Sequence, residues 1–167
     1  MLAVWRRRYE RLLEWVAIAL MAALAVEVTA GVVFRYSGHS LVWYDEVATI
    51  LLAWVTFYGS ALAVMKHAHM GVPEIVRMLP PGLRVGATFV AQACTLAFFG
   101  LLAWMGYVVL EVLASDTLVS LPAVSVAYAQ SVIPVSAVLI IAAQLLVFPE
   151  VLREARRGDI EKAEELI

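Results

Sequence analysis

The stretch LLEWVAIALMAALAVEVTAGVVF, residues 12–34, decides the fold class of this chain. It is long enough for a helix to cross the ~30 Å hydrocarbon core of a membrane, which takes ~20 apolar residues. Three further stretches, 41–65, 85–110 and 123–148, have the same length and character. The sequence therefore predicts an all-α membrane protein with four transmembrane helices, organised as a single four-span domain over residues 1–167.

The positive charges fall on one side of this predicted array. Eleven of the twelve Lys and Arg residues lie before the first span, between the second and third, or after the fourth. The exception is Arg35, which lies at the other end together with Asp45, Glu46, Glu111 and Asp116. Because cytoplasmic flanks of membrane proteins collect Lys and Arg, we expect both termini and the middle loop in the cytoplasm.

The composition excludes a soluble domain. Hydrophobic residues make up 63% of the chain and charged residues 16%, outside the usual range of soluble proteins. The first span is longer than the apolar core of a signal peptide and no polar domain follows it, so we expect it to stay uncleaved. Topology and lipid contact explain the basic residues 6–8 better than nucleic-acid binding does.

The spans contain no residue pattern for catalysis, a metal or a cofactor. His39, His67 and His69 lie in loops, so none reaches the depth of a haem ligand, and His67 and His69 are spaced wrongly for one helical face. The single cysteine, Cys94, lies inside the third span, where thiolate chemistry is disfavoured. We therefore predict that the chain is not an enzyme and carries no cofactor.

Prolines, glycines and serines predict the smaller elements. Ser40 is a candidate cap for the second helix, and Pro73 could open a short interfacial helix in the middle loop. Pro134 predicts a kink within the fourth span. The tail after Pro149 alternates charges in a helical pattern, which Gly158-Asp159 is expected to break into two pieces.

The second span has two different faces. At about 100° per residue, its bulky side gathers Trp43, Glu46, Ile50, Trp54 and Phe57. The opposite side gathers Leu52, Thr56, Gly59 and Ala63, below Asp45. Gly59 and Ala63 form a small-xxx-small pair that permits close backbone approach. Ordinary packing within the chain and a dedicated face for a partner protein both account for this pattern.

Arg35, Asp45 and Glu46 are expected to form an outer charge cluster. They lie one short turn apart, and an unpaired charge this near hydrocarbon is costly, which favours an ion pair across the turn. The alternative is that Arg35 is exposed and helps to dock an extracytoplasmic protein.

Four polar residues lie within the spans. Glu27 and Gln130 are predicted at one depth and Gln92 and Gln144 at another, so that hydrogen bonds between spans could satisfy them. An intramembrane carboxylate is also a candidate cation or proton site, but no second acid or base completes a relay with Glu27. The structural interpretation is favoured.

Several of these residues form a family pattern. It comprises Phe34-Arg35-Tyr36, Trp43-x-Asp45-Glu46, Trp54-x-x-Phe57-x-Gly59, His69, Leu79-Pro80, Leu121-Pro122 and Ile133-Pro134. Over essentially the whole chain this resembles the small membrane subunit of tripartite ATP-independent periplasmic (TRAP) transporters, the DctQ-like family. The family often has an aspartate shortly after the loop histidine, where this chain has Glu74 after Pro73.

The resemblance implies a partner and a place. In such systems a large membrane subunit carries substrate and sodium by an elevator movement, and a soluble periplasmic binding protein delivers an organic acid. The small subunit looks like a scaffold for the large one in the bacterial inner membrane. The resemblance implies packing contacts, within the bundle or with the large subunit, at Trp43, Trp54, Phe57, Gly59 and Ala63.

Two other functions compete with this interpretation. One is a four-span exporter that works alone, with Glu27 binding a cation or proton, although the strong charge bias disfavours it. The other is a membrane anchor of a redox complex, which would need histidines at haem depth.

Overall fold

The computed structural model describes residues 2–66 and 80–164. Within them, four long helices, α1 (Leu2–Tyr36), α2 (Tyr44–Met65), α4 (Pro81–Leu113) and α6 (Val132–Glu164), are joined by a short α5 (Val126–Gln130). Each long helix contains a segment long and apolar enough to cross a membrane. The prediction of an all-α, four-span protein is confirmed. The helix expected after Pro73 lies outside the described residues.

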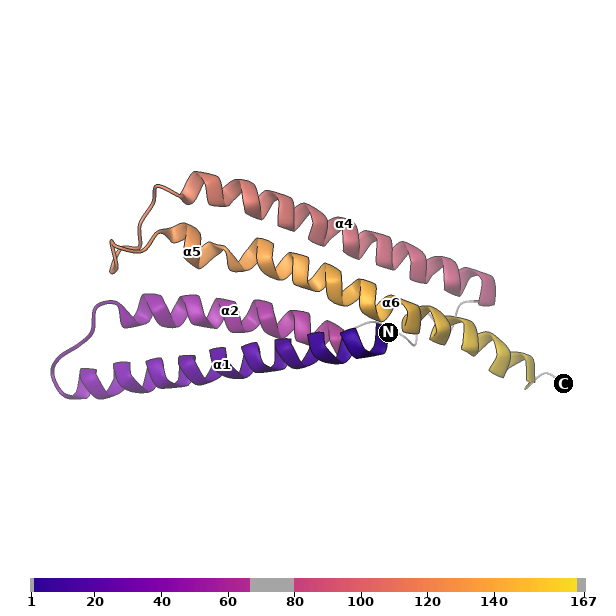
Figure 1. Cartoon of the computed structure of the whole chain (residues 1–167), viewed down its shortest axis with the longest axis horizontal. Coiled ribbons are helices and arrows are strands. Elements are labelled where there is room, and N and C mark those ends of the chain that lie inside the picture. Colours follow the sequence, from indigo (N-terminus) through magenta and orange to yellow (C-terminus); the bar gives the residue numbers. More distant parts are fainter. Residues whose placement is uncertain (1, 67–79, 165–167) are drawn as a thin grey trace.

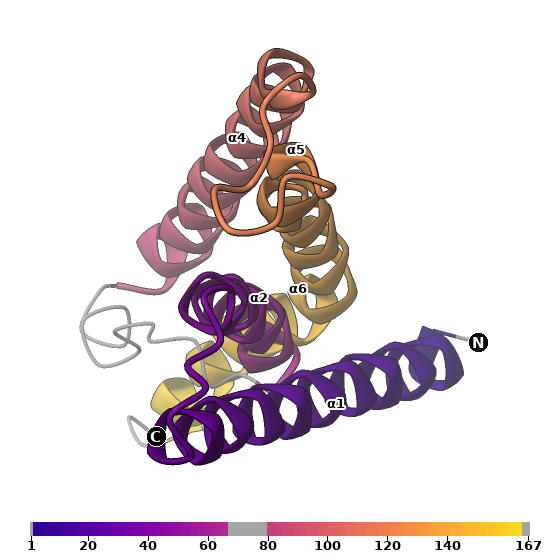
Figure 2. The same cartoon turned by 90° about the vertical axis from the view of Figure 1, so that its left-hand side faces the viewer.

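The four long helices lie side by side in the order α1, α2, α6, α4 (Figure 1). Thus α2 and α6 are the inner members of the row and α1 and α4 form its two edges. The connections 37–43 and 114–125 lie at one end, which we call the loop end, and both chain termini lie at the other, the terminal end. Figure 2 shows that α1 and α6 diverge toward the loop end.

The contact between α1 and α2 follows a heptad-like pattern. Its α1 side is a stripe of buried and half-buried positions at alternating spacings of four and three: Leu13, Ala17, Leu20, Leu24, Glu27 and Gly31. This spacing is typical of nearly antiparallel helices that pack ridges into grooves. At Gly31 the two helices fit closely, because an added Cβ would lie 2.3 Å from the Tyr44 ring.

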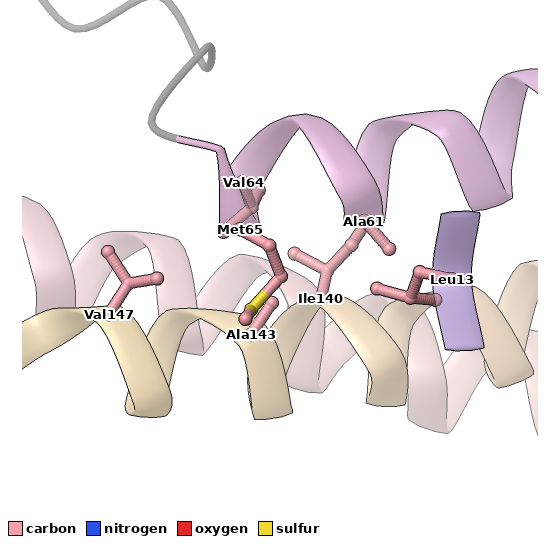
Figure 3. Close-up of a cluster of buried hydrophobic side chains, with 7 residues drawn as sticks. All are labelled: Leu13, Ala61, Val64, Met65, Ile140, Ala143 and Val147. Carbon is pink, nitrogen blue, oxygen red and sulfur yellow. The ribbon is translucent and has the colours of Figure 1, made fainter. Parts of the chain in front are cut away.

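The buried core joins three helices near the terminal end (Figure 3). It consists of Leu13 from α1, Ala61, Val64 and Met65 from α2, and Ile140, Ala143 and Val147 from α6. Ala61 and Ala143 are fully buried, and such small residues let helix backbones approach closely. Most large apolar side chains of α1 and α4 instead face outward, as expected for the lipid-facing edges of a membrane protein.

The second helix begins later than expected. Ser40 does not cap it: α2 starts at Tyr44, with Trp43 at the N-cap position and no side-chain cap hydrogen bond. Gly38 adopts a left-handed conformation (φ 77°) just after the end of α1. Residues 37–43 form the connection to α2. Asp45 and Glu46 do lie in the first turn of α2, as predicted.

The last span is also divided differently from the prediction. The helix is interrupted at Ser131, so Pro134 is the third residue of α6 and the break lies in the turn just before the proline, where a proline disrupts a helix. A proline is tolerated in a first turn, where its missing N–H would have no partner in the helix. The predicted break at Gly158-Asp159 is wrong, since α6 runs unbroken to Glu164. Its tail is rich in Glu, Arg and Ala, which favour helix and outweigh the cost of one glycine, about 1 kcal/mol.

Candidate functional site

Glu46 holds the loop that connects α4 to α5. Its carboxylate accepts hydrogen bonds from the backbone N–H of Val119 at 3.2 Å and of Ser120 at 2.9 Å, and from the Ser120 hydroxyl. A carboxylate that accepts several N–H and O–H donors makes strong, charge-assisted bonds. The first turn of α2 is therefore fastened to a loop more than seventy residues later.

The fastened loop is internally ordered. An antiparallel bridge joins Thr117 to Ser125, and the N–H of Leu118 donates to the Val124 carbonyl at 2.9 Å. The Leu118 side chain is buried, whereas the next residue, Val119, is 94% exposed at the loop end of the molecule. Glu46 thus fixes a loop that presents an apolar side chain outward.

The expected ion pair at the loop end is not formed. Among the described residues, neither Asp45 nor Glu46 pairs with Arg35, which is exposed beside Val32 and Tyr36. Glu46 is engaged instead by the 114–125 loop, where its carboxylate accepts hydrogen bonds from Val119 and Ser120. Arg35 is thus exposed, and its role in docking an extracytoplasmic protein stays a prediction.

The predicted hydrogen bonds within the spans are also absent between the described residues. Glu27 lies on the α2-facing stripe of α1, but its Oε1 is buried without a partner. Gln130 is exposed on α5, and α2 separates α1 from that part of the molecule. Equal depth was a poor guide here because it says nothing about lateral order.

Gln92 and Gln144 do lie on neighbouring helices. Contacts of Phe89 with Phe148 and of Gly106 with Pro134 set the antiparallel register of α4 and α6, and place the two amides near one level. No hydrogen bond joins them, however, and the Gln92 Nε2 is buried without a partner. The pairing prediction is wrong in its bond, although the levels agree.

The two faces of α2 have different surroundings, as the sequence indicated. The indole N–H of Trp54 donates to the Ala129 carbonyl of α5 at 3.0 Å, and its ring lies 6.3 Å from that of Tyr58. The bulky face therefore packs inside the chain, with Trp43 and Phe57 half-buried.

The opposite face of α2 is left open by the part of the chain that the structure describes. An added Cβ at Gly59 would meet no atom within 4 Å. The exposed residues on this side are Asp45, Thr49, Leu52 and Thr56. The threonine hydroxyls donate to carbonyls one turn earlier in α2, as at Thr56, 2.8 Å from the Leu52 carbonyl. We call this set, with Gly59 and Ala63, the open face of α2.

An ion-pair network that the sequence analysis missed ties the helices together at the terminal end. Lys66 lies 2.5 Å from Glu14 and 4.0 Å from Glu10, both on α1. The hydrogen bond and the charge of Glu14 raise the pKa of Lys66. Arg6 pairs with Glu150 of α6 and donates to the Met65 carbonyl at 3.5 Å. The spacing of Glu10 and Glu14, one turn apart, was the available signal.

The network includes one uncharged contact. The Tyr9 hydroxyl donates to the Leu139 carbonyl at 2.7 Å and so joins α1 directly to α6. Within residues 2–66 and 80–164 no cluster of His, Cys, Asp and Glu could hold a metal ion. The ion pairs and hydrogen bonds described above therefore join the helices and the 114–125 loop to one another.

Comparison with known proteins places this arrangement in a family. The C4-dicarboxylate TRAP transporter small permease protein DctQ of Vibrio cholerae serotype O1 is 32% identical over 86 residues. The matched region is 51% of this chain, and the chain spans 37% of that relative's length. The family model of the DctQ component of tripartite ATP-independent periplasmic transporters matches residues 24–154. That match covers well over half of the residues, and the chain therefore belongs to the DctQ component family.

Proposed function

We propose that this chain is the non-catalytic small membrane subunit of a TRAP-type secondary transporter, in which it scaffolds a large, sodium-coupled elevator subunit. On this proposal a periplasmic binding protein delivers an organic acid to the large subunit. The observation that carries the proposal is the arrangement of the helices in an open row (Figure 1). A row with two free edges can brace a neighbour along its length, whereas a carrier needs a polar path enclosed by its helices.

The distribution of polar groups supports a scaffold. The ion pairs and the Glu46 hydrogen bonds lie at the two ends of the array and hold α1, α2, α6 and the 114–125 loop to one another. In the middle, Glu27 stands on the stripe of α1 that packs against α2. Fixed ends and an apolar middle suit a part that stays still while a partner moves.

The open face of α2 is the proposed contact with the large subunit. Outward-facing side chains of α1 and α4 are mostly large and apolar, which suits lipid, while the open face offers hydroxyls, Gly59 and Ala63. Small residues let a second helix approach closely, and membrane helices associate through such faces. Trp43, Trp54 and Phe57 then act indirectly, because they hold α2 against the rest of the chain.

The proposed location is the bacterial inner membrane with both termini in the cytoplasm. The terminal end carries Arg6, Arg7, Arg8, Arg11, Lys66, Arg84 and Arg153, and the loop end carries Arg35 alone among the described Lys and Arg residues. The charge bias that sets membrane orientation supports a cytoplasmic terminal end. The loop end, with Arg35, Asp45 and exposed Val119, then faces the periplasmic binding protein.

The substrate proposal is a carboxylate. The Vibrio cholerae relative carries C4-dicarboxylate in its name, and acidic substrates are what the family resemblance implies. No residue of this chain is proposed to bind the substrate, so its exact identity is a property of the other two components.

Co-purification tests the proposed contact. Gly59→Leu fills the open face, and we expect it to reduce the yield of co-purified large subunit severalfold while the chain itself still folds. Gly100→Leu is the matched control, because an added Cβ there also meets no atom within 4 Å but the residue lies on α4. Equal yields from both variants would contradict the assignment of the open face.

A further inference from the structure

The basic residues near the N-terminus fall into two groups with different surroundings. Arg6 is engaged by Glu150 and the Met65 carbonyl. Arg7, Arg8 and Arg11 are exposed, and no ion pair or hydrogen bond joins them to another residue in the described part of the chain. Of the nearby acids of α1, Glu14 lies 2.5 Å from the Lys66 ammonium group and Glu10 lies 4.0 Å from it.

Two of these arginines share a face with a tryptophan. At about 100° per residue, Arg8, Arg11 and Trp15 fall within about 60° of one another on α1. Leu13 and Gly31, which are buried against α2, lie roughly opposite. Trp15 is 71% exposed, so this face points away from the rest of the chain. Because α1 is an edge of the row, no other described helix covers it (Figure 2).

The three side chains also follow one another along α1 toward the middle of the predicted span, residues 12–34. From Arg8 to Trp15 the helix rises about 10 Å, from the aqueous side to the start of the apolar span. Tryptophan prefers the boundary between headgroups and hydrocarbon, and guanidinium groups form paired hydrogen bonds with phosphate oxygens. Below Trp15 the same side of α1 continues with exposed apolar residues such as Ile18, which suits acyl chains.

We propose that Arg8, Arg11 and Trp15 form a binding site for the headgroup of an anionic phospholipid in the leaflet at the terminal end. The two guanidinium groups bind the phosphate, and the indole packs on the glycerol region. This site rests on the membrane placement of α1 and not on the transporter role. It fixes the depth and tilt of the edge helix, whose packing on α2 positions the open face.

Lipid binding by the full chain in a neutral detergent tests the site. Bound phosphatidylglycerol and phosphatidylcholine with identical acyl chains are measured by native mass spectrometry. We expect a clear preference for phosphatidylglycerol. Each basic residue contributes about 1 kcal/mol with anionic lipid and 1.4 kcal/mol is tenfold, so the Arg8→Gln, Arg11→Gln double variant should lose about 30-fold in affinity.

Matched variants separate the site from net charge. Arg35→Gln with Arg153→Gln removes the same charge from exposed positions elsewhere and should bind as the unaltered chain does. Arg8→Lys with Arg11→Lys should retain much of the preference. Equal losses in the two glutamine pairs, or no preference for phosphatidylglycerol in the unaltered chain, would overturn the proposal.

A second readout does not depend on counting bound lipids. Brominated phosphatidylglycerol should quench tryptophan fluorescence less in Trp15→Phe than in the unaltered chain, and competing inorganic phosphate should not reverse the quenching. Unchanged quenching in Trp15→Phe would show that the Trp15 indole does not contact the bound lipid. Full reversal by phosphate would mean that a free anion, and not a lipid, is the ligand.

Discussion

Glu46 and Ser120 lie seventy-four positions apart in the chain, and two hydrogen bonds join them, from the Ser120 N–H and hydroxyl to the Glu46 Oε2. The contact links the first turn of α2 to the connection between α4 and α5. This contact therefore joins the elements at the loop end. At the terminal end, the ion pairs of Lys66 and Arg6 join the helices in the same way.

Glu46→Ala should loosen the 114–125 loop without unfolding the helices. The backbone N–H groups of Val119 and Ser120 lose their acceptor, so their hydrogen exchange should speed up by roughly tenfold or more. Ser120→Ala keeps the backbone donors and should have a smaller effect. Glu111→Ala is the control, since Glu111 is an exposed acid at the same end. Unchanged hydrogen exchange in Glu46→Ala would show that the internal hydrogen bonds of the loop are enough to keep it ordered.

The same change is expected to act on transport through the loop. We predict that Glu46→Ala lowers uptake or subunit association in the assembled transporter, while the substrate affinity of the isolated binding protein stays the same. Normal uptake together with a normal yield of complex would remove Glu46 from any functional role.

Gly31→Ala should destabilise the α1–α2 hairpin. The added methyl would lie 2.3 Å from the Tyr44 ring, and overpacking of this kind costs about 1–3 kcal/mol. Thermal unfolding followed by circular dichroism measures the loss. Gly86→Ala, with open space around the new Cβ, should be neutral or slightly stabilising. Tyr44→Leu combined with Gly31→Ala should recover part of the stability that Gly31→Ala loses. If the stability changes of the two single variants simply add in the double variant, no clash joins the two positions.

Glu27→Gln should keep most of the transport activity. The carboxyl has no partner among the described residues and stands on a packing stripe, so an amide of the same shape changes little there. Sodium-driven uptake by the assembled transporter is the measurement. Complete loss of uptake with an intact complex would assign Glu27 a role in coupling and favour the exporter-like alternative.

Lys66 should give the fold a dependence on alkaline pH. Glu14 raises the pKa of Lys66 above the unfolded value of about 10.4, so the stabilisation is fully present below that pH and fades as the pH rises through the folded pKa. The difference in melting temperature between the unaltered chain and Lys66→Gln should therefore be constant near neutral pH and shrink above about pH 10. A difference that grows with pH would contradict the assigned pair.

The fold was largely predictable because membrane spans are set by length and hydrophobicity, as the apolar stretch at residues 12–34 shows. The different faces of α2 were also visible in the sequence, but the sequence left open whether the bulky face packs inside the chain, as Trp54 does. The pairing of polar groups was not predictable. Arg35 is close to Glu46 along the chain, yet the Glu46 carboxylate is engaged by the 114–125 loop. Glu27 matches Gln130 in depth, yet α2 lies between α1 and α5. Lateral order is decided by packing between distant segments, which hydropathy does not encode.

Reconstitution in liposomes tests the central claim most directly. The chain is purified alone and together with the proposed large subunit, and uptake of a labelled carboxylate is measured under a sodium gradient with the proposed binding protein added. We predict no flux from the chain alone and sodium-dependent flux from the three components together, which falls sharply when this chain is left out. Gradient-driven flux of a solute through the chain alone would contradict the account.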